Sequence, residues 1–319
     1  MPIECARMQV VRKSWGRTDL RPWSEVHDGV PIGELWFQRA DANAPGSALL
    51  LKLLFTEEPL SIQVHPDDSF AQSIGLTRGK TEAWYVVSAM PSAEVAIGLK
   101  RQLTAAQLHG SIDDGSISDL VQWRRVQKDD IIFVPAGTIH AIGAGLVIAE
   151  IQQRSDATFR LFDHGRQREL HVNNAVAVAN AGPAQSQLRP KRLTDARTLL
   201  IACPHFVLER IDLSRQSNWE LYADHETWVF ILEGHARVGL MNAFVGEALF
   251  LEDARTSIEV GSDGLMGLLA YVGPEPVANL LRNLAGQNVG SIPRASSRPN
   301  PIHHRARLGS PVHSTEARS

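Results

Sequence analysis

The stretch Leu60-Ser-Ile-Gln-Val-His-Pro66 is a strand-length run in which polar and apolar side chains alternate. Because successive side chains of a strand point to opposite faces, Ser61, Gln63 and His65 share one face and the apolar residues between them take the other. A polar row that faces the inside of a barrel needs partners, since unpaired polar groups are costly to bury. A metal ion would satisfy Gln63 and His65 together.

Two further residues complete a candidate metal site. Glu82 opens another strand-like run, in which it is the only charged group on its face, and a divalent cation would pair a carboxylate there. His140 ends the stretch Phe133-Val-Pro-Ala-Gly-Thr-Ile-His140, whose proline and glycine shape a turn that returns the histidine to the barrel. Two imidazoles and a carboxylate, with the Gln63 amide as a fourth ligand, are typical of catalytic zinc. By ligand type alone, Fe(II), Mn(II) or Co(II) would also fit.

The rest of the chain consists largely of short apolar runs bounded by glycine, proline or aspartate and rich in β-branched and aromatic residues. This pattern is typical of an all-β sandwich or barrel. Helical patches are fewer. Thr104-Ala-Ala-Gln107 has the spacing of a capping box, and residues 170–180 form a second candidate helix.

The two halves of the chain resemble each other. Thr81-Glu-Ala-Trp-Tyr-Val86 matches His225-Glu-Thr-Trp-Val-Phe230, and residues 133–140 match residues 250–257, which indicates a duplicated β domain. The second copy has Ser257 where the first has His140, so we expect it to keep the fold and bind no metal. The expected division is a catalytic domain with helical insertions at 1–182, a linker at 183–199, a degenerate second domain at 200–288 and a disordered tail at 289–319.

Composition limits the partners. The chain has 319 residues, of which 44% are hydrophobic, and a formal net charge of -3, which gives no basic field for nucleic acid or an anionic membrane. It contains neither a signal-peptide pattern nor an apolar run long enough for a membrane helix. Cys5 and Cys203 stand in no paired motif. We therefore expect a cytoplasmic monomer or homodimer that binds a small molecule.

Four motifs in order resemble the cupin superfamily and, more narrowly, the type I mannose-6-phosphate isomerases: residues 59–68, 79–84, 133–140 and 150–160. The resemblance implies two cupin (double-stranded β-helix, jelly-roll) barrels with short helical insertions. It implies one Zn²⁺ per chain, held by Gln63, His65, Glu82 and His140. Carried over by position, the catalytic lysine and the active-site arginine would be Lys80 and Arg160, and the phosphate-contacting serine and lysine would be Ser61 and Lys52.

The family interconverts mannose 6-phosphate and fructose 6-phosphate through an enediol, which requires an acid/base group, stabilisation of the enediolate and a phosphate site. We expect burial and a nearby cation to lower the pKa of Lys80 and suit it to proton transfer, with His65 as a rival base. Arg160 would stabilise the enediolate. The alternatives are a metal-dependent cupin of another class, such as an oxygenase, and a non-catalytic sugar-phosphate-binding protein. Residues 158–166 also differ from the usual bacterial motif, having Phe159, Phe162 and His164 in place of two tyrosines and a tryptophan.

Overall fold

The computed structural model describes residues 3–284, which belong to one compact unit and are dominated by strands, with four short helices in that range. The prediction of an all-β fold with short helical insertions is confirmed. The expected tail at 289–319 lies outside the described residues. Within the described residues, no helix is both long enough and apolar enough to cross a membrane.

Two facing sheets form the first barrel, and their inward apolar side chains pack together. One sheet has, in spatial order, β2 (Arg7–Arg17), β3 (Ile32–Gln38), β4 (Leu49–Thr56), β11 (Leu146–Gln153), β6 (Glu82–Ala89) and β9 (Ile131–Val134). The other has β12 (Phe159–Phe162), β5 (Ile62–Val64), β10 (His140–Ile142), β7 (Glu94–Leu99) and β8 (Val121–Arg125).

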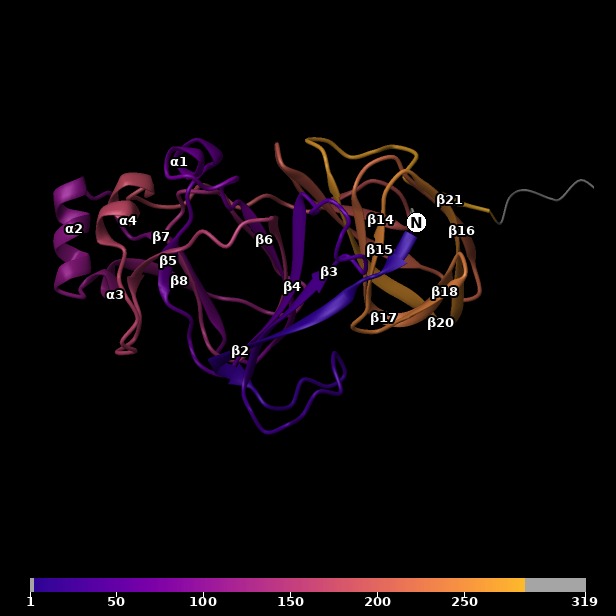
Figure 1. Ribbon diagram of the computed structural model, residues 1–319, viewed down its shortest axis with the longest axis horizontal. Helices are drawn as coiled ribbons and strands as arrows, with labels where there is room; N and C mark the ends of the chain where they lie inside the picture. Colours follow the sequence, from indigo (N-terminus) through magenta and orange to yellow (C-terminus); the bar gives the residue numbers. More distant parts are fainter. Residues whose placement is uncertain (1–2, 285–319) are drawn as a thin grey trace, which may run out of the picture. The chain divides into compact units, whose positions relative to one another are not determined.

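The four helices are α1 (Asp68–Ser73), α2 (Ala105–Asp113), α3 (Ile117–Leu120) and α4 (Val172–Val178). Figure 1 shows α2, α3 and α4 together beside β5, β7 and β8, and the same region of the chain forms one apolar cluster. The capping box at the start of α2 is confirmed, because Thr104 and Gln107 exchange both side-chain hydrogen bonds. The helices cover the outer face of the five-stranded sheet, so that its inner face is left to the barrel.

The second barrel is built on one ten-stranded sheet of the described residues. Its strands are β1 (Ile3–Cys5), β13 (Lys191–Arg192), β14 (Arg197–Ala202), β15 (Phe206–Leu213), β16 (Asn218–Ala223), β17 (Thr227–Val238), β18 (Met241–Phe244), β19 (Ala248–Leu251), β20 (Ala254–Val272) and β21 (Leu281–Asn283). Apolar side chains fill its core, among them Val229, Leu249 and Leu269.

The strand pairing adds two details to the expected domain division, which stays a prediction. The N-terminal strand β1 pairs with β19 and so belongs to the second barrel's sheet, as Figure 1 shows at the label N. Residues 191–192 and 197–199, within the expected linker, pair with each other and with β15. The backbone groups of this segment are therefore satisfied by sheet hydrogen bonds.

Strand β6 shows how the fold places the site. Glu82, Trp84 and Val86 point into the first barrel, where the two apolar residues join its inner core. Ala83 and Tyr85 point the other way, into a core shared with Trp228, Phe250 and other residues of the second barrel. Because this strand is buried on both faces, its alternation directs the single carboxylate, that of Glu82, into the first barrel.

Candidate metal centre and cavity

His65, Glu82 and His140 converge inside the first barrel, and one ligand atom from each lies within 4.8 Å of the others. Nε2 of His65 lies 3.4 Å from one Glu82 carboxylate oxygen, and Nε2 of His140 lies 3.5 Å from the other. All three side chains are buried, with exposed fractions of 1% or less. Such a cluster could hold a metal ion.

The two histidines are oriented through their second ring nitrogens. His65 Nδ1 donates to the carbonyl of Ala157 and His140 Nδ1 to that of Thr138, each at 2.8 Å. The carbonyls can only accept, so the lone pair of each ring remains on Nε2, which faces Glu82. Burial, followed by the charge of Lys80, lowers the pKa of His65 to about 3, and burial lowers the pKa of His140. Both rings are therefore neutral, as metal coordination requires.

Gln63 lies opposite His140 in the β5–β10 pairing. Its amide nitrogen is 3.3 Å from His140 Nε2, and its amide oxygen accepts from the Ser61 hydroxyl at 3.2 Å. A half-turn of the amide exchanges these two atoms and directs the oxygen towards His140 and Glu82. The row of Ser61, Gln63 and His65 expected from strand alternation thus lies on one side of the centre.

Lys80 enters the same centre. Its ammonium lies 3.0 Å from His65 Nε2 and forms an ion pair with Glu82. The expected lowering of the lysine pKa by burial and a metal cation stays a prediction, but the side chains around Lys80 act in the opposite direction. Burial lowers the pKa, but Glu82 and Glu150 outweigh it and leave the pKa of Lys80 raised.

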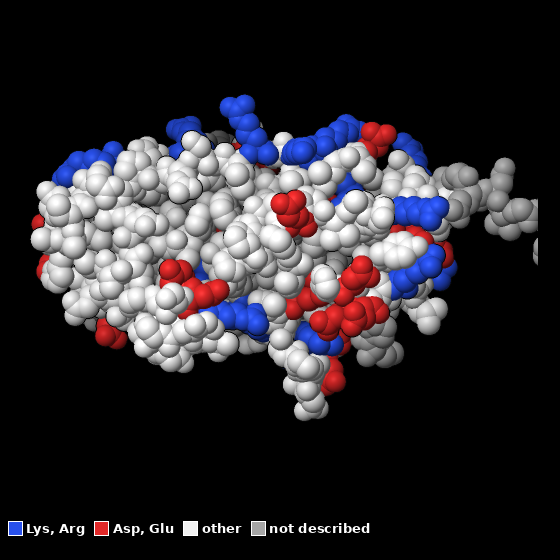
Figure 2. Space-filling model, turned by 90° about the horizontal axis from the view of Figure 1, so that it is seen from above, with Lys and Arg blue, Asp and Glu red and all other residues white. Residues whose placement is uncertain are grey.

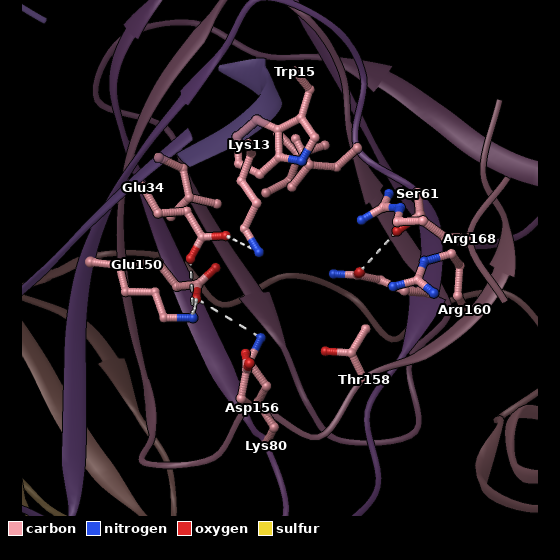
Figure 3. A pocket seen from close by; sticks show the side chains of 15 residues that line it. Lys13, Trp15, Glu34, Ser61, Lys80, Glu150, Asp156, Thr158, Arg160 and Arg168 are labelled. Carbon is pink, nitrogen blue, oxygen red and sulfur yellow. Dashed lines mark hydrogen bonds and ion pairs between the residues drawn. The ribbon is translucent and has the colours of Figure 1, made fainter. Parts of the chain in front are cut away.

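A cavity of about 210 Å³ opens beside the centre. One wall carries charges of alternating sign from the barrel rim to Lys80 (Figure 3). The successive ion pairs are Lys13–Glu34 at 3.7 Å, Glu34–Lys52 at 3.7 Å, Lys52–Glu150 at 3.6 Å and Glu150–Lys80 at 3.9 Å. Lys80 also pairs with Glu82, and Asp156 lies beside it, so the cations of this wall are matched by neighbouring carboxyl groups.

The opposite wall carries Ser61, Thr158, Arg160 and Arg168, as Figure 3 shows. The buried carboxylate of Asp163 accepts hydrogen bonds from both Arg166 and Arg168. The Nε of Arg168 lies 2.7 Å from one of its oxygens. Arg160 donates to the Glu169 carbonyl at 2.7 Å, while its Nε has no hydrogen-bond partner among residues 3–284. Two guanidinium groups with spare donors make this wall the cationic side of the cavity.

Outside the cavity the charges are mixed. The face in Figure 2 carries basic and acidic side chains near one another, with broad uncharged areas between them. This face therefore offers no extended field of one sign, and the cationic wall lies inside the cavity.

The sequence argument missed several residues that line the cavity: Lys13, Trp15, Glu34, Glu150, Asp156, Thr158 and Arg168. Glu150, Asp156 and Thr158 stand in a motif quoted for the resemblance, but no local pattern gave them a role. Lys13 and Glu34 come from β2 and β3, which reach the cavity only through sheet pairing. Lys52 carried a signal, since it interrupts the buried apolar run of β4 and a buried ammonium needs carboxylate partners.

Comparisons place this architecture among known proteins. No family model matches the chain. It is 34% identical over 229 residues to mannose-6-phosphate isomerase of Streptococcus mutans and 30% identical over 227 residues to mannose-6-phosphate isomerase ManA of Bacillus subtilis. Each match covers 67% of this chain and 71% of the relative.

Solved structures share the fold. The crystal structure of mannose 6-phosphate isomerase from Bacillus subtilis matches with a TM-score of 0.73 at 24% identity, covering 85% of this chain and 99% of that one. A zinc-bound mannose 6-phosphate isomerase matches with a TM-score of 0.66 at 14% identity, covering 86% of this chain and 100% of that one. The two-barrel architecture is therefore that of these solved structures.

Proposed function

The chain belongs to the mannose-6-phosphate isomerase family, and we propose on this basis that its first barrel interconverts mannose 6-phosphate and fructose 6-phosphate. The observation that carries the proposal is the buried cluster of His65, Glu82 and His140 at one side of a cavity whose other side is cationic. A sugar phosphate needs both features, because its reacting carbons and its phosphate lie at opposite ends of the molecule.

We propose one zinc ion per chain, with Gln63, His65, Glu82 and His140 as ligands. The donor set supports this choice, since two neutral imidazoles present Nε2 and the buried Glu82 carboxylate pairs, within residues 3–284, with the Lys80 ammonium. A zinc-bound structure with the same fold is consistent with it. When bound, zinc would act as a Lewis acid towards the oxygens on C1 and C2 of the sugar.

The reaction moves a proton between C1 and C2, and we assign its transfer to Lys80. His65 is a poorer candidate, because a ring that ligates through Nε2 and donates Nδ1–H to Ala157 has no free atom to accept a proton. Glu150 lies 3.9 Å from the Lys80 ammonium, and burial and Glu82 raise its pKa to about 7. Glu150 can therefore take up and release a proton near neutral pH directly beside the Lys80 ammonium.

We assign the phosphate to the cationic wall, to Ser61 and Arg168, and the developing negative charge of the enediolate to Arg160. Lys52 is the part of the expected phosphate site that we reassign. Its ammonium is almost fully buried between Glu34 and Glu150, which already balance its charge. It is better suited to keeping those carboxylates in place.

A coupled assay of mannose 6-phosphate conversion, run before and after removal of metal by a chelator and again after zinc is restored, tests the proposal. We expect turnover that is lost with the metal and recovered with zinc. Binding of sugar phosphate without turnover would indicate a non-catalytic binding protein, and oxygen uptake with bound iron would indicate an oxygenase. The cytoplasmic location and the monomeric or dimeric state stay predictions.

A further inference from the structure

Glu226 of the second barrel corresponds to the proposed metal ligand Glu82 in the first. Each glutamate accepts from the indole nitrogen of the tryptophan two residues later, at 3.0 Å in both cases. The remaining partners differ. Glu226 is buried and accepts from the backbone amides of Ala48 and Leu49, the latter at 2.8 Å. The Glu226 carboxylate of the second barrel therefore binds the backbone of the first barrel at the start of β4.

Residue Ala48 connects this contact to a turn of the first barrel. Its carbonyl accepts from the backbone amide of Arg154 at 2.8 Å and from the Arg78 guanidinium at 3.0 Å. Arg154 also donates to Ser47 Oγ at 2.8 Å, which adds a second tie between the two segments. Residues 47–49, which Glu226 binds, are thus hydrogen-bonded to the start of the segment 154–158.

The turn formed by residues 154–158 supports His65, one of the proposed metal ligands. The Ser155 hydroxyl donates to the Arg78 carbonyl at 3.0 Å and accepts from the Ala157 amide at 3.3 Å. The Ala157 carbonyl accepts from Nδ1 of His65 at 2.8 Å. Hydrogen bonds joined by the backbone of Ala48, residues 154–155 and Ala157 therefore connect the second barrel to the ring of His65. The same turn carries Asp156 and Thr158 into the cavity.

We propose that Glu226 is a positioning residue for the metal site: it fixes residues 47–49, and through them the 154–158 turn that orients His65. The inference rests on the proposed metal site. Two backbone amides and an indole donate hydrogen bonds to Glu226, and Arg154 is near enough for its charge to interact with the carboxylate. The second barrel then contributes to metal binding without holding a metal.

The Glu226→Gln variant tests this, because it keeps the size of the side chain but turns one acceptor into a donor that faces a backbone N–H. Zinc affinity is measured by competition with a chromophoric chelator, and the absorption spectrum of the cobalt-substituted protein reports the ligand geometry. We expect affinity to fall by about 10-fold, the lower end of the roughly 10- to 100-fold loss seen when partners of metal ligands are removed. We also expect a changed cobalt spectrum.

Glu209→Gln is the matched control. Glu209 is buried, like Glu226, and lies in the same barrel, but the partners of its carboxylate are Arg197, at 2.7 Å, and Tyr271. We expect this variant to lose stability and keep its zinc affinity and cobalt spectrum. Equal effects of the two variants on zinc affinity would reduce Glu226 to a general stabilising residue and overturn the proposal.

Ser155→Ala breaks the same series inside the first barrel, and its effect should be less than multiplicative with that of Glu226→Gln. Where Glu226→Gln does not fold, Glu226→Asp shortens the carboxylate and keeps its charge, and the same loss of affinity is expected. Wild-type zinc affinity in a folded Glu226 variant overturns the inference. A wild-type protein that binds neither zinc nor cobalt would instead overturn the proposed metal site.

Discussion

The Lys80 ammonium lies 3.0 Å from Nε2 of His65, the atom through which that ring would coordinate a metal. The same ammonium also forms an ion pair with Glu82, so Lys80 contacts two of the three clustered side chains. Lys80, the proposed proton-transfer group, thus lies directly beside two of the proposed metal ligands. Substitution of Lys80 can therefore be read against metal binding as well as turnover.

Removal of a proposed ligand tests the metal site. His140→Ala should lose most of the bound zinc and most of the activity, because one of two imidazole ligands is gone. Metal analysis of purified protein, expected to give about one zinc per wild-type chain, checks the result. His235→Ala, on the second barrel beside Phe244, serves as the control and should keep its zinc. Full zinc occupancy in His140→Ala would refute the ligand assignment.

Lys80→Met separates catalysis from metal binding. The variant keeps the length of the apolar stem, and lysine is not a proposed zinc ligand, so it should fold and keep its zinc. Turnover should fall by roughly 10²- to 10⁴-fold, the usual contribution of one acid/base group. Steady-state kinetics on zinc-loaded protein provide the measurement. Near-normal turnover in that protein would shift the proton transfer to Glu150 or a bound water.

The two arginines of the cationic wall should differ in their kinetic effects. Arg168→Ala should raise KM for mannose 6-phosphate by about 10- to 100-fold with little change in kcat, which corresponds to one charge-assisted hydrogen bond of about 1.5–3 kcal/mol. Arg160→Ala should lower kcat more than it raises KM, because the charge it meets develops during the reaction. Inhibition by inorganic phosphate should weaken in Arg168→Ala alone. The reverse pattern would exchange the two roles.

Acidification should destabilise the metal-free protein through His65. Burial and Lys80 lower its folded-state pKa to about 3, against roughly 6.5 for an unperturbed histidine in the unfolded chain. The stability contributed by the neutral ring is therefore present above about pH 6.5 and is lost as the pH falls towards 3, at about 1.4 kcal/mol per pH unit.

Denaturant unfolding of chelator-treated protein between pH 7 and pH 4.5 measures this slope. Carboxylates contribute as well, so the informative comparison is His65→Gln. In this variant the dependence of the unfolding free energy on pH should be smaller by the contribution of about one proton. An identical slope in wild type and variant would show that His65 takes up no proton on unfolding.

The local sequence pattern was sufficient to predict on which face of its strand each candidate ligand lies. The alternation of residues 60–66 and of β6 depends only on the geometry of successive peptide units, so Gln63, His65 and Glu82 could be assigned to one interior before any pairing was known. His140 followed from the proline and glycine of its turn, and the catalytic roles came from resemblance to a family rather than from the pattern itself.

Tertiary structure decided what depends on which distant segments meet. The sequence match aligned Phe133 with Phe250, and Ala83 with Thr227. In the structure Ala83 pairs with Phe133, whereas Thr227 pairs with Leu251. The two copies are therefore displaced by one residue at this strand. The charge of Lys52 is balanced only because β3 and β11 flank β4.

Arg168 reaches the cavity through its bond to Asp163, and Glu226 reaches the first barrel through the packing of two sheets. The sequence around Arg168 and Glu226 contains no local pattern that predicts these contacts. Pairing register and charge compensation are set by long-range burial and hydrogen bonding, whereas side-chain alternation is set by the backbone of a single strand.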